Sequence, residues 1–107
     1  MKVPAEVKVA CLEKWHQARD LIVLCEGEDD EFKEEIYSEW WRTRGLQWCA
    51  LCIHFRYLDC GYCPLTSGGY CSPEWDAIYK AASELFIPTF ETQVPLMLKR
   101  LYALEVE

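Results

Sequence analysis

The chain of 107 residues is short enough for a single domain, which we place over residues 1–107. Hydrophobic residues make up 51% of it and five residues are tryptophan, a composition that excludes a disordered segment. No stretch approaches the ~20 consecutive apolar residues that cross a bilayer, and the opening MKVPAEVKV lacks the apolar centre of a signal peptide. We therefore expect a cytoplasmic protein with no membrane partner.

The net charge of −7 is concentrated in one acidic segment, residues 26–35. Its sequence, EGEDDEFKEE, has seven acids and one lysine, so the other 97 residues hold 11 acids against 10 bases. This balance argues against binding to a nucleic-acid backbone, which calls for a basic face. We expect the acidic segment to dock on a basic surface of a protein partner, and a solvated helix face is the alternative. The residues expected in contact are Asp29, Asp30, Glu34 and Glu35.

Apolar spacing and terminator residues predict two helices within residues 4–45. The first spans about 4–25, with Pro4 in its first turn and Lys14 on its wetter side. The second starts in the acidic segment, where the helix dipole favours carboxylates, and closes before Gly45.

The rest of the chain divides into a cysteine-rich segment, residues 46–71, and C-terminal helices within 72–107. Apolar spacing favours a short helix over 46–58, and glycines and prolines make 59–71 a loop.

The sequence SPEW at 72–75 predicts the start of a helix, with Ser72 as its cap and Pro73 in the first turn. We expect this helix to run to about Phe86 and to be ended by Pro88. A last helix follows, with Pro95 in its first turn or at a kink. The predicted fold is therefore mainly α, a small helical domain of four to five helices with a central cysteine-rich metal-binding loop.

The cysteine-rich segment holds five of the seven cysteines in the spacing C-x2-C-x7-C-x2-C-x7-C. Two residues between cysteines let both sulfurs reach one ion, and two such pairs can supply the four thiolates of a tetrahedral zinc site. We therefore predict a structural zinc site, with spacing alone leaving open which four cysteines bind. The candidate ligands are Cys49, Cys52, Cys60, Cys63 and Cys71.

Three other interpretations of these cysteines stay open. An iron–sulfur cluster also takes four thiolates, and Cys63 followed by Pro64 is typical of ferredoxin-type runs, although the ferredoxin spacing is absent. Trp48 before a C-x2-C pair is typical of redox dithiols, but no βαβ pattern surrounds it. The third interpretation is a set of buried thiols that act as small hydrophobes, although five cysteines within 23 residues are hard to explain that way.

Two cysteines and two tryptophans outside the cysteine-rich segment are also informative. Cys11 and Cys25 lie 14 residues apart on one predicted helix, about 21 Å from each other, so they cannot bridge and are assigned to the core. Trp40 and Trp41 adjoin on the second helix and point about 100° apart, so both can be buried only if that helix is covered on two sides. We expect one of them to lie at a partner surface.

The pattern CALC, then DCGYCPL, then CSPEWDAIY resembles small cysteine-rich proteins encoded by bacteriophages and prophages. The resemblance covers residues 48–79 and leaves both flanks unmatched. It implies a metal-stabilised accessory protein that acts on host or viral machinery, and it brings no activity with it.

The sequence carries no Ser/His/Asp set, no Gly-rich phosphate loop and no H-E-x-x-H motif, so we expect no enzyme. A zinc site filled by cysteines has no open position for substrate. Arg42, Arg44 and Arg56 are too few local bases for a phosphate footprint. The predicted function is a non-catalytic acidic interaction protein with structural zinc, and the alternative is an iron–sulfur protein that transfers electrons or senses redox state.

Overall fold

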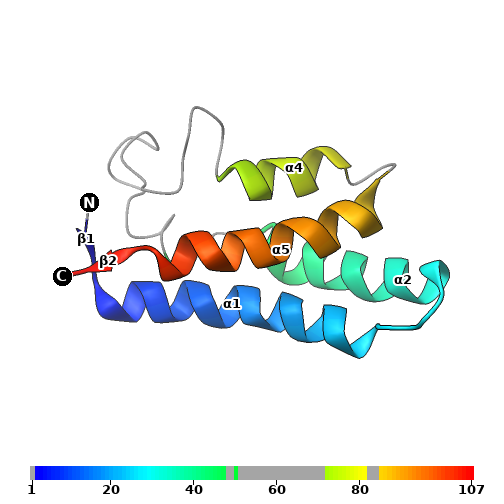
Figure 1. Ribbon diagram of the computed structural model, residues 1–107, viewed down its shortest axis with the longest axis horizontal. Coiled ribbons are helices and arrows are strands. Elements are labelled where there is room, and N and C mark those ends of the chain that lie inside the picture. The colour runs from blue at the N-terminus through cyan, green and yellow to red at the C-terminus, as the bar shows by residue number, and fades with distance from the viewer. Residues whose placement is uncertain (1, 48–49, 51–71, 82–84) are drawn as a thin grey trace.

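The computed structural model describes residues 2–47, 50, 72–81 and 85–107 and is mainly helical. Helix α5 lies against α1, α2 and α4 (Figure 1), so it is the element around which the described helices gather. The predicted helical class is confirmed, whereas the short helix over 46–58 and the cysteine-rich loop lie largely outside the described residues. The elements are β1 (Lys2–Val3), α1 (Ala5–Leu24), α2 (Asp30–Trp40), the π-helix η1 (Trp41–Gly45), α4 (Pro73–Ala81), α5 (Phe86–Tyr102) and β2 (Glu105–Val106).

Helix α1 agrees with the first predicted helix to within a residue at each end. Pro4 is its N-cap, and the core positions Cys11 and Ala18 are 1% and 0% exposed. Cys25 closes the helix and is also fully buried, as predicted. Gly27 then takes φ 81°, a left-handed conformation that side chains disfavour, and turns the chain into α2.

Helix α2 and the π-helix η1 form one continuous rod that replaces the second predicted helix. Asp29 caps it, because its carboxylate accepts a hydrogen bond of 2.9 Å from the backbone N–H of Phe32. The last turn is wider than predicted, since the N–H of Leu46 donates to the carbonyl of Trp41, five residues earlier, at 2.9 Å.

The start of α4 is as predicted, but the boundary between α4 and α5 is not. Ser72 caps α4 by accepting a hydrogen bond from the N–H of Trp75 at 3.1 Å. Phe86, expected to close this helix, is instead the first residue of α5. Pro88 therefore lies in the first turn of α5, where its missing N–H removes no helical hydrogen bond. Pro95 lies inside α5 and not in its first turn.

A two-stranded parallel ribbon, which the sequence did not predict, joins the two ends of the described chain. Lys2 pairs with Glu105 and Val3 with Val106, and the N–H of Glu107 donates to the carbonyl of Val3 at 2.9 Å. Val3 is fully buried, so the ribbon also caps this end of the core.

Aromatic rings from α1, α2, η1, α4 and α5 pack against one another in the core. Trp40 and Trp41 are 6% and 4% exposed, and each meets rings from two different elements. The helix that carries them is thus covered on two sides. This is the condition, stated from the sequence, under which both tryptophans can be buried. The ring pairs and their centroid separations are Trp40–Trp15 (5.4 Å), Trp40–Phe90 (5.7 Å), Trp41–Trp75 (5.5 Å) and Trp41–Phe86 (6.5 Å).

Substituting Gly45 tests how tightly this core is closed. A Cβ at Gly45 would overlap Cε3 of Trp41 and would lie 2.9 Å from Cζ3 of Trp41 and 3.0 Å from Cζ3 of Trp40. Gly45→Ala should therefore lower the free energy of unfolding by about 1–3 kcal/mol, the usual cost of overpacking, as measured by chemical denaturation. The control is Thr43→Ala on the exposed side of the same turn, which should cost less than about 1 kcal/mol. Equal losses in the two variants would contradict the assigned packing.

Candidate functional site

The five predicted metal ligands, Cys49, Cys52, Cys60, Cys63 and Cys71, lie outside the described residues. Within the described part of the chain, no three histidine, cysteine or acidic side chains are grouped to hold a metal ion. What the structure does describe is the body on either side of these cysteines.

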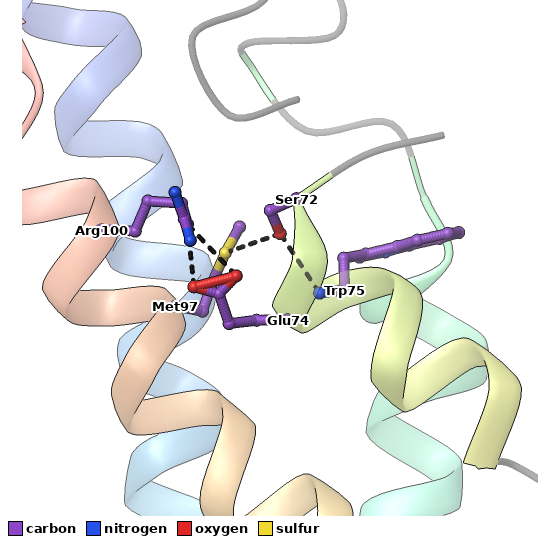
Figure 2. Close-up of polar contacts among 5 residues, drawn as sticks. All are labelled: Ser72, Glu74, Trp75, Met97 and Arg100. Carbon is purple, nitrogen blue, oxygen red and sulfur yellow. Dashed lines mark hydrogen bonds and ion pairs between the residues drawn. The ribbon is translucent and has the colours of Figure 1, made fainter. Parts of the chain in front are cut away.

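The chain entering the cysteine-rich segment and the chain leaving it are held together. The indole Nε1–H of Trp75 donates to the carbonyl of Gly45 at 2.9 Å, and the ring of Trp75 lies 5.5 Å from that of Trp41. Ser72, directly after the segment, is fully buried, and its Oγ–H donates to the sulfur of Met97 at 3.2 Å (Figure 2). The segment therefore starts and ends at neighbouring points of the helical body.

Lys14 was expected on the wetter side of its helix, and this expectation is wrong, because the side chain is buried. The residue is only 7% exposed, and its Nζ donates to the carbonyl of Gln47 at 3.0 Å and approaches that of Gly45 at 3.5 Å. Charge-assisted hydrogen bonds of this kind offset the cost of burying an ammonium. Lys14 thus fixes the entrance of the cysteine-rich segment from the side of α1.

The acidic segment lies at the corner between α1 and α2 (Figure 1), and all seven of its carboxylates are exposed. Two of the four predicted contact residues have local partners: Asp29 caps α2, and Glu34 accepts a hydrogen bond of 3.1 Å from Ser38. Asp30 has no partner among the described residues. It lies in the first turn of α2, where the helix dipole stabilises its negative charge. The single base, Lys33, pairs with Glu91 of α5 at 3.4 Å, so its charge is directed out of the segment.

Trp40 and Trp41 are not available to a partner. Both belong to the aromatic core, which corrects the expectation that one of them lies at a partner surface. The physical reason is that α5 carries rings that meet both, Phe90 against Trp40 and Phe86 against Trp41. A sequence pattern indicates which residues share a helix face but not which other helices cover it.

A partly buried polar contact ties α2 to α5 next to the acidic segment. The fully buried Tyr37 donates its hydroxyl hydrogen to Oε2 of Glu91 at 2.7 Å, and its ring stacks on Phe90 at 4.5 Å. Burial, followed by the hydrogen bond to Glu91, raises the pKa of Tyr37 well above its usual value. Burial and then the charge of Glu28 likewise raise the pKa of the Cys25 thiol.

A groove of about 510 Å³ lies between α4 and α5. Its floor contains an ion pair that sequence reasoning missed: Nε of Arg100 donates to Oε1 and Oε2 of Glu74 at 2.8 and 3.1 Å (Figure 2). Glu74 is only 5% exposed, although its place in the first turn of a helix suggests a solvated carboxylate. The available signal was weak, because Glu74 and Arg100 lie 26 residues apart.

No family model matches this sequence, and neither the curated proteins nor the solved structures contain a match. Among the described helices, none is both long enough and apolar enough to cross a membrane. The assignment of the candidate site residues therefore depends on the sequence and structure of this chain alone.

Tyr37→Phe tests the buried contact through its pH dependence. At pH 7 the variant should lose about 1 kcal/mol of unfolding free energy, because the hydrogen bond to Glu91 is gone. Above pH ~10 the unfolded wild type loses the Tyr37 proton while the folded form keeps it, since the folded pKa is raised. The stability contributed by Tyr37 is therefore present below pH ~10 and falls as the pH rises further, so the difference between wild type and variant should shrink.

Urea denaturation at several pH values between 7 and 11 measures this difference. The exposed hydroxyl of Tyr79 supplies the control, since Tyr79→Phe should leave the free energy of unfolding unchanged at pH 7. A difference between wild type and Tyr37→Phe that grew with rising pH would contradict the assignment.

Proposed function

We propose that this protein is a non-catalytic interaction protein whose acidic segment binds a basic surface of another protein, and whose cysteine-rich segment holds a structural zinc ion. The observation that carries the proposal is that all seven acidic residues within 26–35 are exposed. The partner is a protein and not a nucleic acid, since this charge repels a phosphate backbone.

The charge in the acidic segment exceeds what the fold requires. Capping α2 uses Asp29, and the helix dipole benefits from carboxylates only within about the first turn. Glu34 and Glu35 lie beyond that turn and are exposed. Because Lys33 is engaged by Glu91, the local field stays strongly negative and would speed encounter with a basic surface.

The zinc proposal is supported by cysteine spacing and by the anchored ends of the cysteine-rich segment. Lys14 holds Gln47 on one side, and Trp75 and Ser72 hold the other. Anchored ends would lower the entropic cost of bringing the two C-x2-C pairs together, which a four-thiolate site needs. In a reducing cytoplasm such thiols stay available to metal, and the resemblance of residues 48–79 to phage proteins favours a partner in host machinery.

The first test is the metal content of freshly purified protein kept under reducing conditions. We expect close to one equivalent of zinc, lost in Cys63→Ala and kept in Cys11→Ala, because Cys11 belongs to the core. Removing zinc with a chelator should lower the melting temperature of wild type and of Cys11→Ala but not of Cys63→Ala. A brown preparation with iron and acid-labile sulfide would instead support the iron–sulfur alternative, and the absence of both metals would refute the site.

The second test neutralises the acidic segment without removing its cap. Asp29→Asn, Asp30→Asn, Glu34→Gln and Glu35→Gln in one variant change the net charge from −7 to −3, and asparagine still caps a helix. Affinity for a protein captured from the source cells should fall at least about tenfold at physiological salt, with a weaker salt dependence than wild type.

A matched control changes four exposed acids elsewhere by the same total charge. The control substitutions are Glu6→Gln, Glu13→Gln, Asp20→Asn and Glu105→Gln, all at exposed positions. Equal losses in both variants would assign the effect to net charge alone. Unchanged affinity in the first variant would leave the acidic segment as a solvated face.

A further inference from the structure

The groove between α4 and α5 has the composition of a small ligand site. Its described lining is Pro73, Glu74, Gln93, Leu96, Lys99, Arg100 and Ala103. Three apolar residues lie beside four polar or charged ones in this open groove, whose volume of about 510 Å³ falls in the range in which proteins bind small groups or short peptide ends. Leu96 is 48% exposed, so the apolar wall is accessible.

Arg100 is held in a fixed orientation at this groove. Its Nε is engaged by both oxygens of the buried Glu74, and its side chain remains 38% exposed. Within the described part of the chain, its two terminal nitrogens have no hydrogen-bond partner. A guanidinium presents these nitrogens as a planar fork that matches the two oxygens of a carboxylate. Because Glu74 already restrains the side chain, little further entropy is lost when the fork binds.

The charge of the groove selects a singly charged ligand. Lys99 and Arg100 contribute +2 and Glu74 −1, so the described lining sums to +1 on a chain of −7. A carboxylate carries one negative charge and neutralises this sum. A phosphate monoester carries a charge of roughly −1.5 to −2 at pH 7, so binding it would leave excess negative charge close to the carboxylate of Glu74.

We propose that this groove binds the C-terminal carboxylate of a peptide that ends in an aliphatic residue. The fork of Arg100 and the ammonium of Lys99 bind the carboxylate, and Leu96 and Pro73 contact the aliphatic side chain. The site shares no residue with the acidic segment or the cysteines, so its test is independent of the proposed function.

The probe is N-acetyl-leucine, which combines one carboxylate, one aliphatic side chain and one amide, added to the purified full chain and followed by NMR. Chemical-shift changes should concentrate on the groove residues, with a dissociation constant on the order of 1–10 mM for a ligand of this size. N-acetyl-leucinamide, which lacks the charge, should bind at least about fivefold more weakly, and inorganic phosphate should also bind more weakly.

Two substitutions and a matched control locate the site. Arg100→Lys keeps a cation opposite Glu74 but removes the fork, and it should weaken binding about fivefold or more. Lys99→Gln changes an exposed side chain and should weaken binding about two- to fivefold without affecting the fold, as checked by circular dichroism. Lys80→Gln removes the same charge at the far end of α4 and should change nothing.

Four results would overturn the proposal. They are no shifts at the groove with tens of millimolar N-acetyl-leucine, equal binding of the uncharged amide, tighter binding of phosphate, and equal effects of Lys80→Gln and Lys99→Gln. If Arg100→Lys does not fold, Lys99→Gln and the comparison of the three ligands still decide the question.

Discussion

Burying two consecutive tryptophans on one helix is the constraint on which the arrangement of this protein depends. Trp40 and Trp41 point in different directions, so covering both needs packing on two sides. Helix α5 contributes to both sides, through Phe90 and Phe86, while α1 and α4 complete them with Trp15 and Trp75. The indole N–H of Trp40 is buried and has no acceptor among the described residues, so ring packing and not a hydrogen bond sets the position of this ring.

The same constraint decides where the cysteine-rich segment leaves the body. Gly45 lies against the tryptophan rings, and its carbonyl is the acceptor for Trp75. The π-helix places this carbonyl at the end of the rod, where Lys14 also reaches. A structural metal in the segment would therefore stabilise a loop whose two ends are already fixed, so less of its binding free energy would be spent on bringing those ends together.

The sequence predicted the parts of the fold that local signals specify. Pro4, the acidic run and the Ser72–Pro73 pair indicated helix starts correctly, because these signals come from residues close in the chain. Phe86 was assigned to the wrong helix, because Pro88 is equally compatible with the end of one helix and the first turn of the next.

Long-range contacts were the part that sequence could not supply. The buried Lys14 binds carbonyls more than 30 residues away, and the buried Glu74 pairs with Arg100. Neither contact can be predicted from the residues close to it in the chain. The same holds for Trp40 and Trp41, whose burial depends on α5. Of the candidate site, the exposure of the acidic segment agreed with expectation, since charged residues in the first turns of a helix usually face water.

The parallel ribbon has a mechanical consequence. The chain enters at the start of β1 and leaves at the end of β2, and the two strands run in the same direction. Tension applied between Lys2 and Val106 pulls the strands past each other along their length, so their hydrogen bonds carry the load together and do not open one at a time. Lys8 adds a crosslink next to the ribbon, since its Nζ donates to the carbonyls of Tyr102 and Leu104 at 2.9 and 2.8 Å. Force along the chain would thus meet resistance at the ribbon before it reaches the aromatic core.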